Sequence, residues 1–133
     1  MISTVIIISA FVFPSVPSDL ITSASLSPSN PTRTVGSSVI LTCTAMLSVD
    51  VSGALIEFDY QLGSTSVGTG SSTASSTTEA DTTTISPVSL STAGDYTCIV
   101  TVTASGVCGG GGSEPTCPTM TSNTVTLTVQ CEC

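Results

Sequence analysis

The sequence predicts an all-β fold, an antiparallel β-sandwich, and three observations support this class. Hydrophobic residues are an ordinary 40% of the chain, but Val, Ile, Leu and Ala supply most of them, alongside β-branched Thr, and these residues suit half-buried strands. Apolar and polar residues alternate with a period of two between Pro, Gly and Ser, without a sustained helical stripe. Six cysteines in 133 residues, with no Cys-x-x-Cys spacing, indicate a disulfide framework and an oxidising, extracellular compartment.

The first element is an apolar run at residues 4–13, followed by Pro14 and Pro17. It is too short to span a bilayer, which takes about 20 residues. Two interpretations stay open: a secretory signal, although no Lys or Arg precedes the run, or a retained extra N-terminal strand. We therefore divide the chain into an apolar segment with its linker, residues 1–20, and a domain at residues 21–133. As a strand, the run would bury these side chains against a neighbouring subunit: Val5, Ile6, Ile7, Ile8, Phe11, Val12 and Phe13.

In four later segments apolar and polar residues alternate, as they do in antiparallel strands with one buried face and one solvent-exposed face. The side chains expected to face inward are Val39, Leu41, Cys43 and Ala45; then Ala54, Ile56, Phe58 and Tyr60; then Tyr96, Cys98, Val100 and Val102; and finally Val125, Leu127 and Val129. Residues 64–84 are almost purely Ser, Thr, Gly and Ala, and we expect exposed loops and a weak edge strand there. Cys108 to Cys117 is Gly-rich and reads as a long hairpin loop.

From about residue 21 to 130 the chain resembles an immunoglobulin-superfamily sandwich. VGSSVILTC resembles the approach to strand B, ending at Cys43, and LSTAGDYTC resembles the corner between strands E and F, with Tyr96 two residues before Cys98. SNTVTLTVQ resembles strand G. The separation of the two cysteines suits the compact intermediate type.

The resemblance implies a core disulfide between Cys43 and Cys98 and a tyrosine corner at Tyr96. The family's strand-C tryptophan is absent, and by parity we expect Phe58 in its place. The family usually has an acidic residue six positions before the strand-F cysteine, and this residue forms a salt bridge with an arginine. Here that position is Thr92, so the salt bridge cannot form.

The remaining cysteines lie in two pairs near the expected ends of the domain. We expect Cys108 and Cys117 to close the F–G hairpin. Cys131 and Cys133 follow strand G at the opposite end of the domain. Two pairings stay open: a strained disulfide between Cys131 and Cys133, or disulfides with Cys108 and Cys117 of another subunit.

Composition excludes several classes of function. A net charge of −8 with Arg33 as the only cation leaves nothing to neutralise phosphates, so nucleic acids and anionic membranes are not expected partners. Without histidine there is no imidazole base and no histidine-bound zinc, so we expect no enzyme activity, catalytic residue, metal or cofactor. Glu57 and Asp59 share one strand face, where a solvated surface is the expected role.

Glycosylation, if present, is expected to be O-linked, because the chain has no Asn-x-Ser/Thr sequon but 24 serines and 24 threonines. The candidate acceptors are Thr73, Thr77, Thr78, Thr82, Thr83, Thr124, Thr126 and Thr128.

Two functions remain. The first is a structural subunit of an extracellular filament, a homopolymer in which the apolar run at residues 4–13 adds to the sheet of a neighbouring copy. The alternative is an immunoglobulin-like recognition or adhesion module at the cell surface, binding a protein or glycan through its loops.

Overall fold

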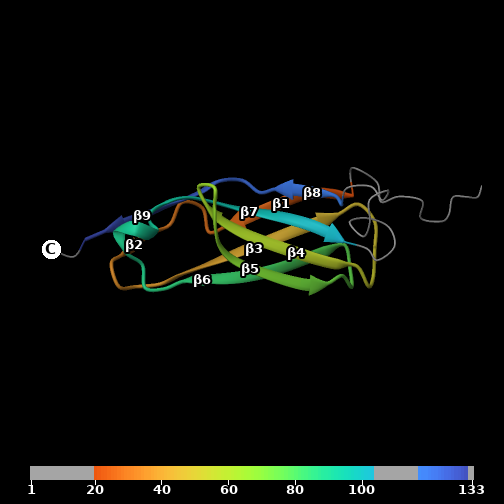
Figure 1. Ribbon diagram of the computed structural model, residues 1–133, viewed down its shortest axis with the longest axis horizontal. Coiled ribbons are helices and arrows are strands. Elements are labelled where there is room, and N and C mark those ends of the chain that lie inside the picture. Colours follow the sequence, from red (N-terminus) through yellow and green to blue (C-terminus); the bar gives the residue numbers. More distant parts are fainter. Residues whose placement is uncertain (1–19, 104–116, 132–133) are drawn as a thin grey trace, which may run out of the picture.

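The protein's architecture, given by a computed structural model, consists of two β-sheets (Figure 1). The structure describes residues 20–103 and 117–131. The three-stranded sheet has the order β1 (Ile21–Ser27), β3 (Val39–Leu47) and β6 (Thr78–Ile85). The six-stranded sheet has the order β2 (Thr32–Thr34), β9 (Val125–Gln130), β7 (Gly94–Thr103), β4 (Leu55–Leu62) and β5 (Thr65–Thr73), with β8 (Thr119–Thr121) also paired to β7. A 3₁₀ turn, η1 (Leu90–Thr92), precedes β7.

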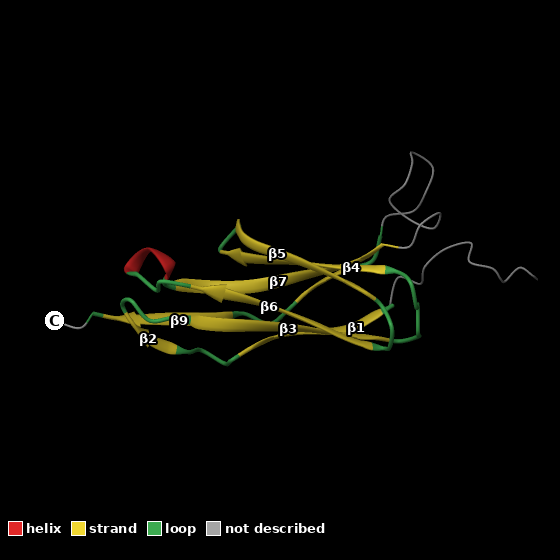
Figure 2. Ribbon diagram, turned by 90° about the horizontal axis from the view of Figure 1, so that it is seen from below, coloured by secondary structure: helices red, strands yellow, loops and turns green. Residues whose placement is uncertain are grey.

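The two sheets form a sandwich, seen from the side in Figure 2, which confirms the all-β class. All described strand pairs are antiparallel except β2 with β9. Burial alternates with the predicted parity along β3, β4, β7 and β9; in β3, for example, the side chains of Val39, Leu41, Cys43 and Ala45 are buried. The alternation places one apolar face of each sheet against the other and leaves the opposite faces to solvent.

A disulfide joins the two sheets in the centre of the core. Cys43 on β3 and Cys98 on β7 are bonded, with their Cα atoms 6.3 Å apart and both side chains fully buried. Because the bond closes a sequence separation of 55 residues, it stabilises the fold by about 4 kcal/mol in the chain-entropy view.

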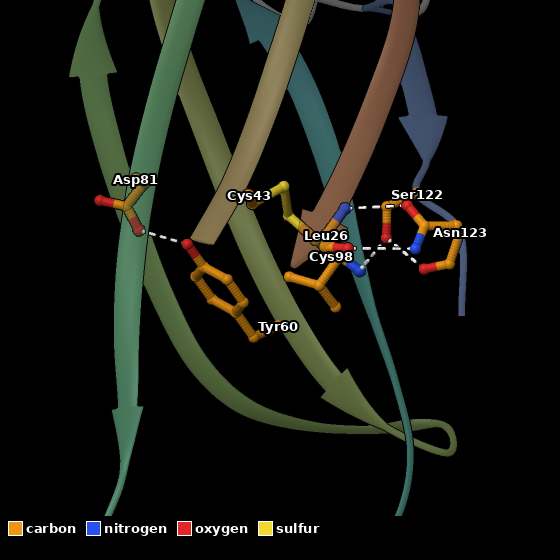
Figure 3. Close-up of a disulfide and its surroundings, with 7 residues drawn as sticks. All are labelled: Leu26, Cys43, Tyr60, Asp81, Cys98, Ser122 and Asn123. Atoms are coloured by element: carbon orange, nitrogen blue, oxygen red, sulfur yellow. Dashed lines mark hydrogen bonds between the residues drawn. A yellow bond between two sulfur atoms is a disulfide. The ribbon is translucent and has the colours of Figure 1, made fainter. Parts of the chain in front are cut away.

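The strand-C residue beside the disulfide differs from the expectation. Strand register places Tyr60 directly opposite Cys98, while Phe58 lies opposite Val100, one inward position further along β4. Phe58 is buried in the core, but the tryptophan-like place belongs to Tyr60 (Figure 3). The sequence could not decide this, because the connection between β3 and β4 sets how far β4 slides along β7.

Residues 64–84 are ordered strands, so the expectation of loops with one weak edge strand is wrong. They form β5 and β6, one at the edge of each sheet. Ile85 is the only large apolar residue that β6 places in the core, and Gly68 and Gly70 bring β5 close to the polar side chains of β6: a Cβ atom at Gly70 would lie 2.2 Å from a carboxylate oxygen of Asp81. The Tyr60 hydroxyl donates a 2.8 Å hydrogen bond to Asp81, and burial, followed by this bond and the carboxylate charge, raises the pKa of Tyr60 far above its usual range.

Glu79 is a second inward acid on β6, with 8% of its side chain exposed. It accepts hydrogen bonds from the backbone N–H groups of Ser75 and Ser76, at 2.8 and 3.2 Å, and from the Ser72 hydroxyl at 3.1 Å. The Ser75 bond is the main cause of a lowered pKa for Glu79. Glu79 thereby holds the turn between β5 and β6.

The strand that the sequence predicts at residues 123–129 is present as β9, and a short strand that the sequence does not predict, β8, precedes it. β8 and β9 both pair with β7, and Ser122, Asn123 and Thr124 separate them. Ser122 continues the contact with β7, since its hydroxyl accepts a 2.9 Å hydrogen bond from the N–H of Cys98. Asn123 instead forms hydrogen bonds with Leu26 on β1 of the other sheet, which explains the break between β8 and β9.

Candidate functional site

Several sequence expectations fall on residues outside the described ranges. The apolar run at residues 4–13, with its interface residues, is one, and Cys108 and Cys133 are others. Cys117 and Cys131 are each disulfide-bonded. Cys117 precedes β8 and Cys131 follows β9, and Figure 1 shows these strand ends at opposite ends of the sandwich.

The tyrosine corner is present. The Tyr96 hydroxyl donates a hydrogen bond to the backbone carbonyl of Thr92, four residues earlier, and Tyr96 is buried. Thr92 closes the turn that positions this carbonyl, because its own hydroxyl accepts from the Ser89 N–H at 2.9 Å and donates to the Ser89 carbonyl at 2.8 Å. A threonine thus holds the corner where the family places an acid.

Most glycan candidates point outward. The exposed ones are Thr73, Thr77, Thr78, Thr82, Thr124, Thr126 and Thr128. Thr83 is the exception: it has the inward parity of β6, and a Cβ atom at Gly68 would lie 2.9 Å from its hydroxyl oxygen. Thr83 therefore has no room for a sugar.

The outer face of the six-stranded sheet contains an open depression of about 530 Å³ over β4, β5 and β7. The strands bring its side chains together in two cross-strand rows. Glu57 lies between Ser71 on β5 and Thr101 on β7, and Asp59 lies between Thr69 and Ile99. The sequence placed the two acids on one exposed face, but only strand pairing adds the hydroxyls and Ile99.

The two carboxylates differ in their surroundings. Asp59 is half-buried and accepts hydrogen bonds from the Ser66 hydroxyl at 2.6 Å and the Gln61 amide at 3.1 Å. Glu57 is exposed and receives no hydrogen bond within the described part of the chain. Two positions apart on a strand, the acids lie about 7 Å from each other.

No described basic residue neutralises these acids. Arg33, the only cation, lies on β2 at the opposite edge of the same sheet, where its guanidinium donates to the carbonyl of Thr32 at 3.0 Å. The described residues also contain no cluster of three His, Cys, Asp or Glu side chains that could hold a metal ion. Among the described residues, the two carboxylates therefore have no cation beside them.

Comparison of the sequence with family models and with curated proteins gives no match. Among solved structures, the chain resembles one in a study of T cell specificity and activation by the bacterial superantigen toxic shock syndrome toxin-1, with 19% identity and a TM-score of 0.50 over 80% of this chain and 98% of that one. It also resembles Drosophila OTK, extracellular domains 3–5, with 16% identity and a TM-score of 0.54, over 89% of this chain but only 38% of that one. The immunoglobulin-like domain of mouse leukocyte-associated immunoglobulin-like receptor 1 aligns at 20% identity and a TM-score of 0.49, over 77% and 90% of the two chains.

The fold is immunoglobulin-like. The sandwich, the Cys43–Cys98 disulfide and the tyrosine corner at Tyr96 establish it, and the solved structures agree. An immunoglobulin-like domain with an intact disulfide fits an extracellular protein. Over the described ranges, no helix has the length and hydropathy needed to cross a membrane.

Proposed function

We propose that the protein is an extracellular, non-enzymatic recognition module that binds a basic protein surface through the outer face of its six-stranded sheet. The depression at Glu57 and Asp59 carries this proposal. It shifts the binding site from the loops, where the sequence suggested it, to the sheet.

The electrostatics of the depression favour a positively charged partner. The carboxylates of Glu57 and Asp59 lie side by side without a cation, and like charges on one strand face repel. A lysine or arginine placed between them would relieve this repulsion and gain charge-assisted hydrogen bonds. With a net charge of −8, the chain also attracts a basic partner at long range, which raises the association rate.

The neutral part of the depression supports a protein partner. The hydroxyls of Thr69, Ser71 and Thr101 can each donate and accept hydrogen bonds, and Ile99 offers an apolar contact beside Asp59. No aromatic side chain with a solvent-facing ring is available there to stack on a sugar, since Phe58 is buried in the core.

The test uses an octalysine peptide as probe and the full chain. Glu57→Gln and Asp59→Asn, combined, should weaken peptide binding at least about tenfold in titration calorimetry. Asp50→Asn is the matched control, since Asp50 is an exposed acid in the loop after β3, and it should change the dissociation constant less than about twofold. Binding should also weaken as salt is raised. A loss of affinity in Asp50→Asn equal to that in the combined variant would contradict the proposal.

The filament subunit is a second candidate, and the free edge of β5 favours it. β5 pairs only with β4 in the described structure, and its nine residues contain neither a proline nor a charge, the features that usually protect an edge. The apolar run at residues 4–13 of another copy is long enough to add along it. The partner would then be further copies of the same chain.

Deleting residues 1–16 tests this candidate. The expected result is a folded monomer that no longer polymerises, seen by electron microscopy of the two forms at the same concentration. Fibres formed by the shortened chain would rule out strand donation.

A further inference from the structure

The outer face of the three-stranded sheet carries no charged side chain among the described residues. Strand register arranges its side chains in rows across β1, β3 and β6. One row is Ser27, Thr42 and Thr82; the next contains Thr44. The acids of β6 do not interrupt the rows, because Glu79 and Asp81 have the inward parity.

Two large apolar side chains stand at the ends of the same face. Ile40 and Met46, near the two ends of the central strand β3, are 57% and 43% exposed. Ile40 lies opposite Thr84, and Met46 accepts a long hydrogen bond from Thr78 at 3.5 Å. Between them the side chains are small, so the face is flat rather than hollowed.

We propose that this face, which we call the hydroxyl face, packs against the same face of a second copy of the chain. The distribution of charged residues supports a contact between two copies at this face. With a net charge of −8, copies repel wherever acids meet, and the six described acids all lie elsewhere: Asp50, Glu57, Asp59, Glu79, Asp81 and Asp95. The hydroxyl face is where two copies approach with the least repulsion.

The chemistry of the face is also self-complementary. A hydroxyl both donates and accepts, so a row such as Ser27, Thr42 and Thr82 can pair with its own copy across a twofold axis. A row of carboxylates could not pair with its own copy in this way, because ionised carboxylates accept hydrogen bonds but donate none. Ile40 and Met46 then bury apolar surface at both ends of the contact.

The size of the face sets the strength of the association. Three strands about 4.8 Å apart and up to about 30 Å long offer about 400 Å² per copy. The total of about 800 Å² lies below the roughly 1,200 Å² of stable interfaces. The pairing is therefore a weak dimer that depends on protein concentration.

Sedimentation equilibrium of the full chain tests the proposal, on material whose intact mass equals that of the unmodified chain. A monomer–dimer equilibrium is expected between about 10 μM and about 1 mM. Raising the salt concentration should strengthen it, because screening reduces the repulsion between two acidic copies. Salt has the opposite effect on the octalysine complex, so the two proposals can fail separately.

Thr82→Glu and Thr128→Glu form a matched pair of variants. Both threonines are exposed strand residues and both changes add one negative charge, but Thr128 lies on β9 of the other sheet. Because the twofold axis brings two copies of the new carboxylate onto one interface, Thr82→Glu should weaken dimerisation at least about tenfold, against less than about twofold for Thr128→Glu. Thermal melts check that both variants fold. A protein that stays monomeric over the whole concentration range overturns the proposal. Equal weakening by Thr82→Glu and Thr128→Glu also overturns it, and this is the result expected if residues 4–13 drive the association.

Discussion

The side-chain amide of Asn123 forms two hydrogen bonds with the backbone of Leu26, in opposite directions. Its Oδ1 accepts from the Leu26 N–H at 2.9 Å, and its Nδ2 donates to the Leu26 carbonyl at 3.1 Å (Figure 3). Leu26 is on β1 of the three-stranded sheet, while Asn123 lies in the break between β8 and β9. The amide thus acts as a strand residue would, and it joins the edges of the two sheets, 97 residues apart in sequence.

Replacing Asn123 by alanine should therefore destabilise the fold. Both polar groups of the Leu26 backbone would lose their partner in a partly buried place, and we expect the free energy of unfolding to fall by about 1–3 kcal/mol in urea denaturation. Gln130→Ala removes an exposed amide from β9 and should cost less than about 0.5 kcal/mol. Equal losses for the two variants would show that the Asn123 bridge contributes nothing specific.

Replacing Glu79 by glutamine should change how stability depends on pH. The pKa of Glu79 is below its ordinary value of 4.5 in the folded protein, so the carboxylate contributes fully above that pH and loses its contribution as pH falls through the folded value. We expect Glu79→Gln to cost about 1–3 kcal/mol at neutral pH and progressively less in acid. Denaturation curves at several pH values measure this. Glu57→Gln, at an exposed acid, is the control, and a Glu79→Gln cost that did not shrink in acid would contradict the prediction.

Truncating Phe58 should be among the most damaging core changes. Phe58 is 1% exposed, and Phe58→Ala should lower the free energy of unfolding by about 3–5 kcal/mol through lost burial and the cavity left behind. Val67→Ala, at a residue of β5 that is 41% exposed, serves as comparison. A loss below about 1 kcal/mol for Phe58→Ala would show that the core does not depend on this ring.

O-linked sugar should appear in the intact mass of material from its natural source. The structure favours Thr73 and Thr77, at the turn between β5 and β6, and the exposed row Thr124, Thr126 and Thr128. Site mapping by mass spectrometry should leave the hydroxyl face bare. A mass equal to the bare chain would reject glycosylation, and sugar on Thr82 would rule out the proposed dimer.

The sequence by itself determines the sandwich, because its signals are local. Period-two alternation depends only on the geometry of a strand, so the inward parity of Cys43, Phe58 and Cys98 could be predicted before any pairing was known. The spacing of Tyr96 and Cys98 is likewise local, and it marks the corner that the structure contains.

Tertiary structure decides what depends on register and on polar partners. Hydrophobic pattern could not assign residues 64–84, because β5 and β6 are held by cross-strand pairing and by Asp81 and Glu79 facing inward rather than by apolar burial. The exchange of Phe58 for Tyr60 beside the disulfide follows from how β4 slides along β7. The candidate site also depends on strand pairing. The sequence shows Glu57 and Asp59 on one face of a strand, but the residues around them come from β5 and β7. No local sequence pattern predicts which strands will lie side by side.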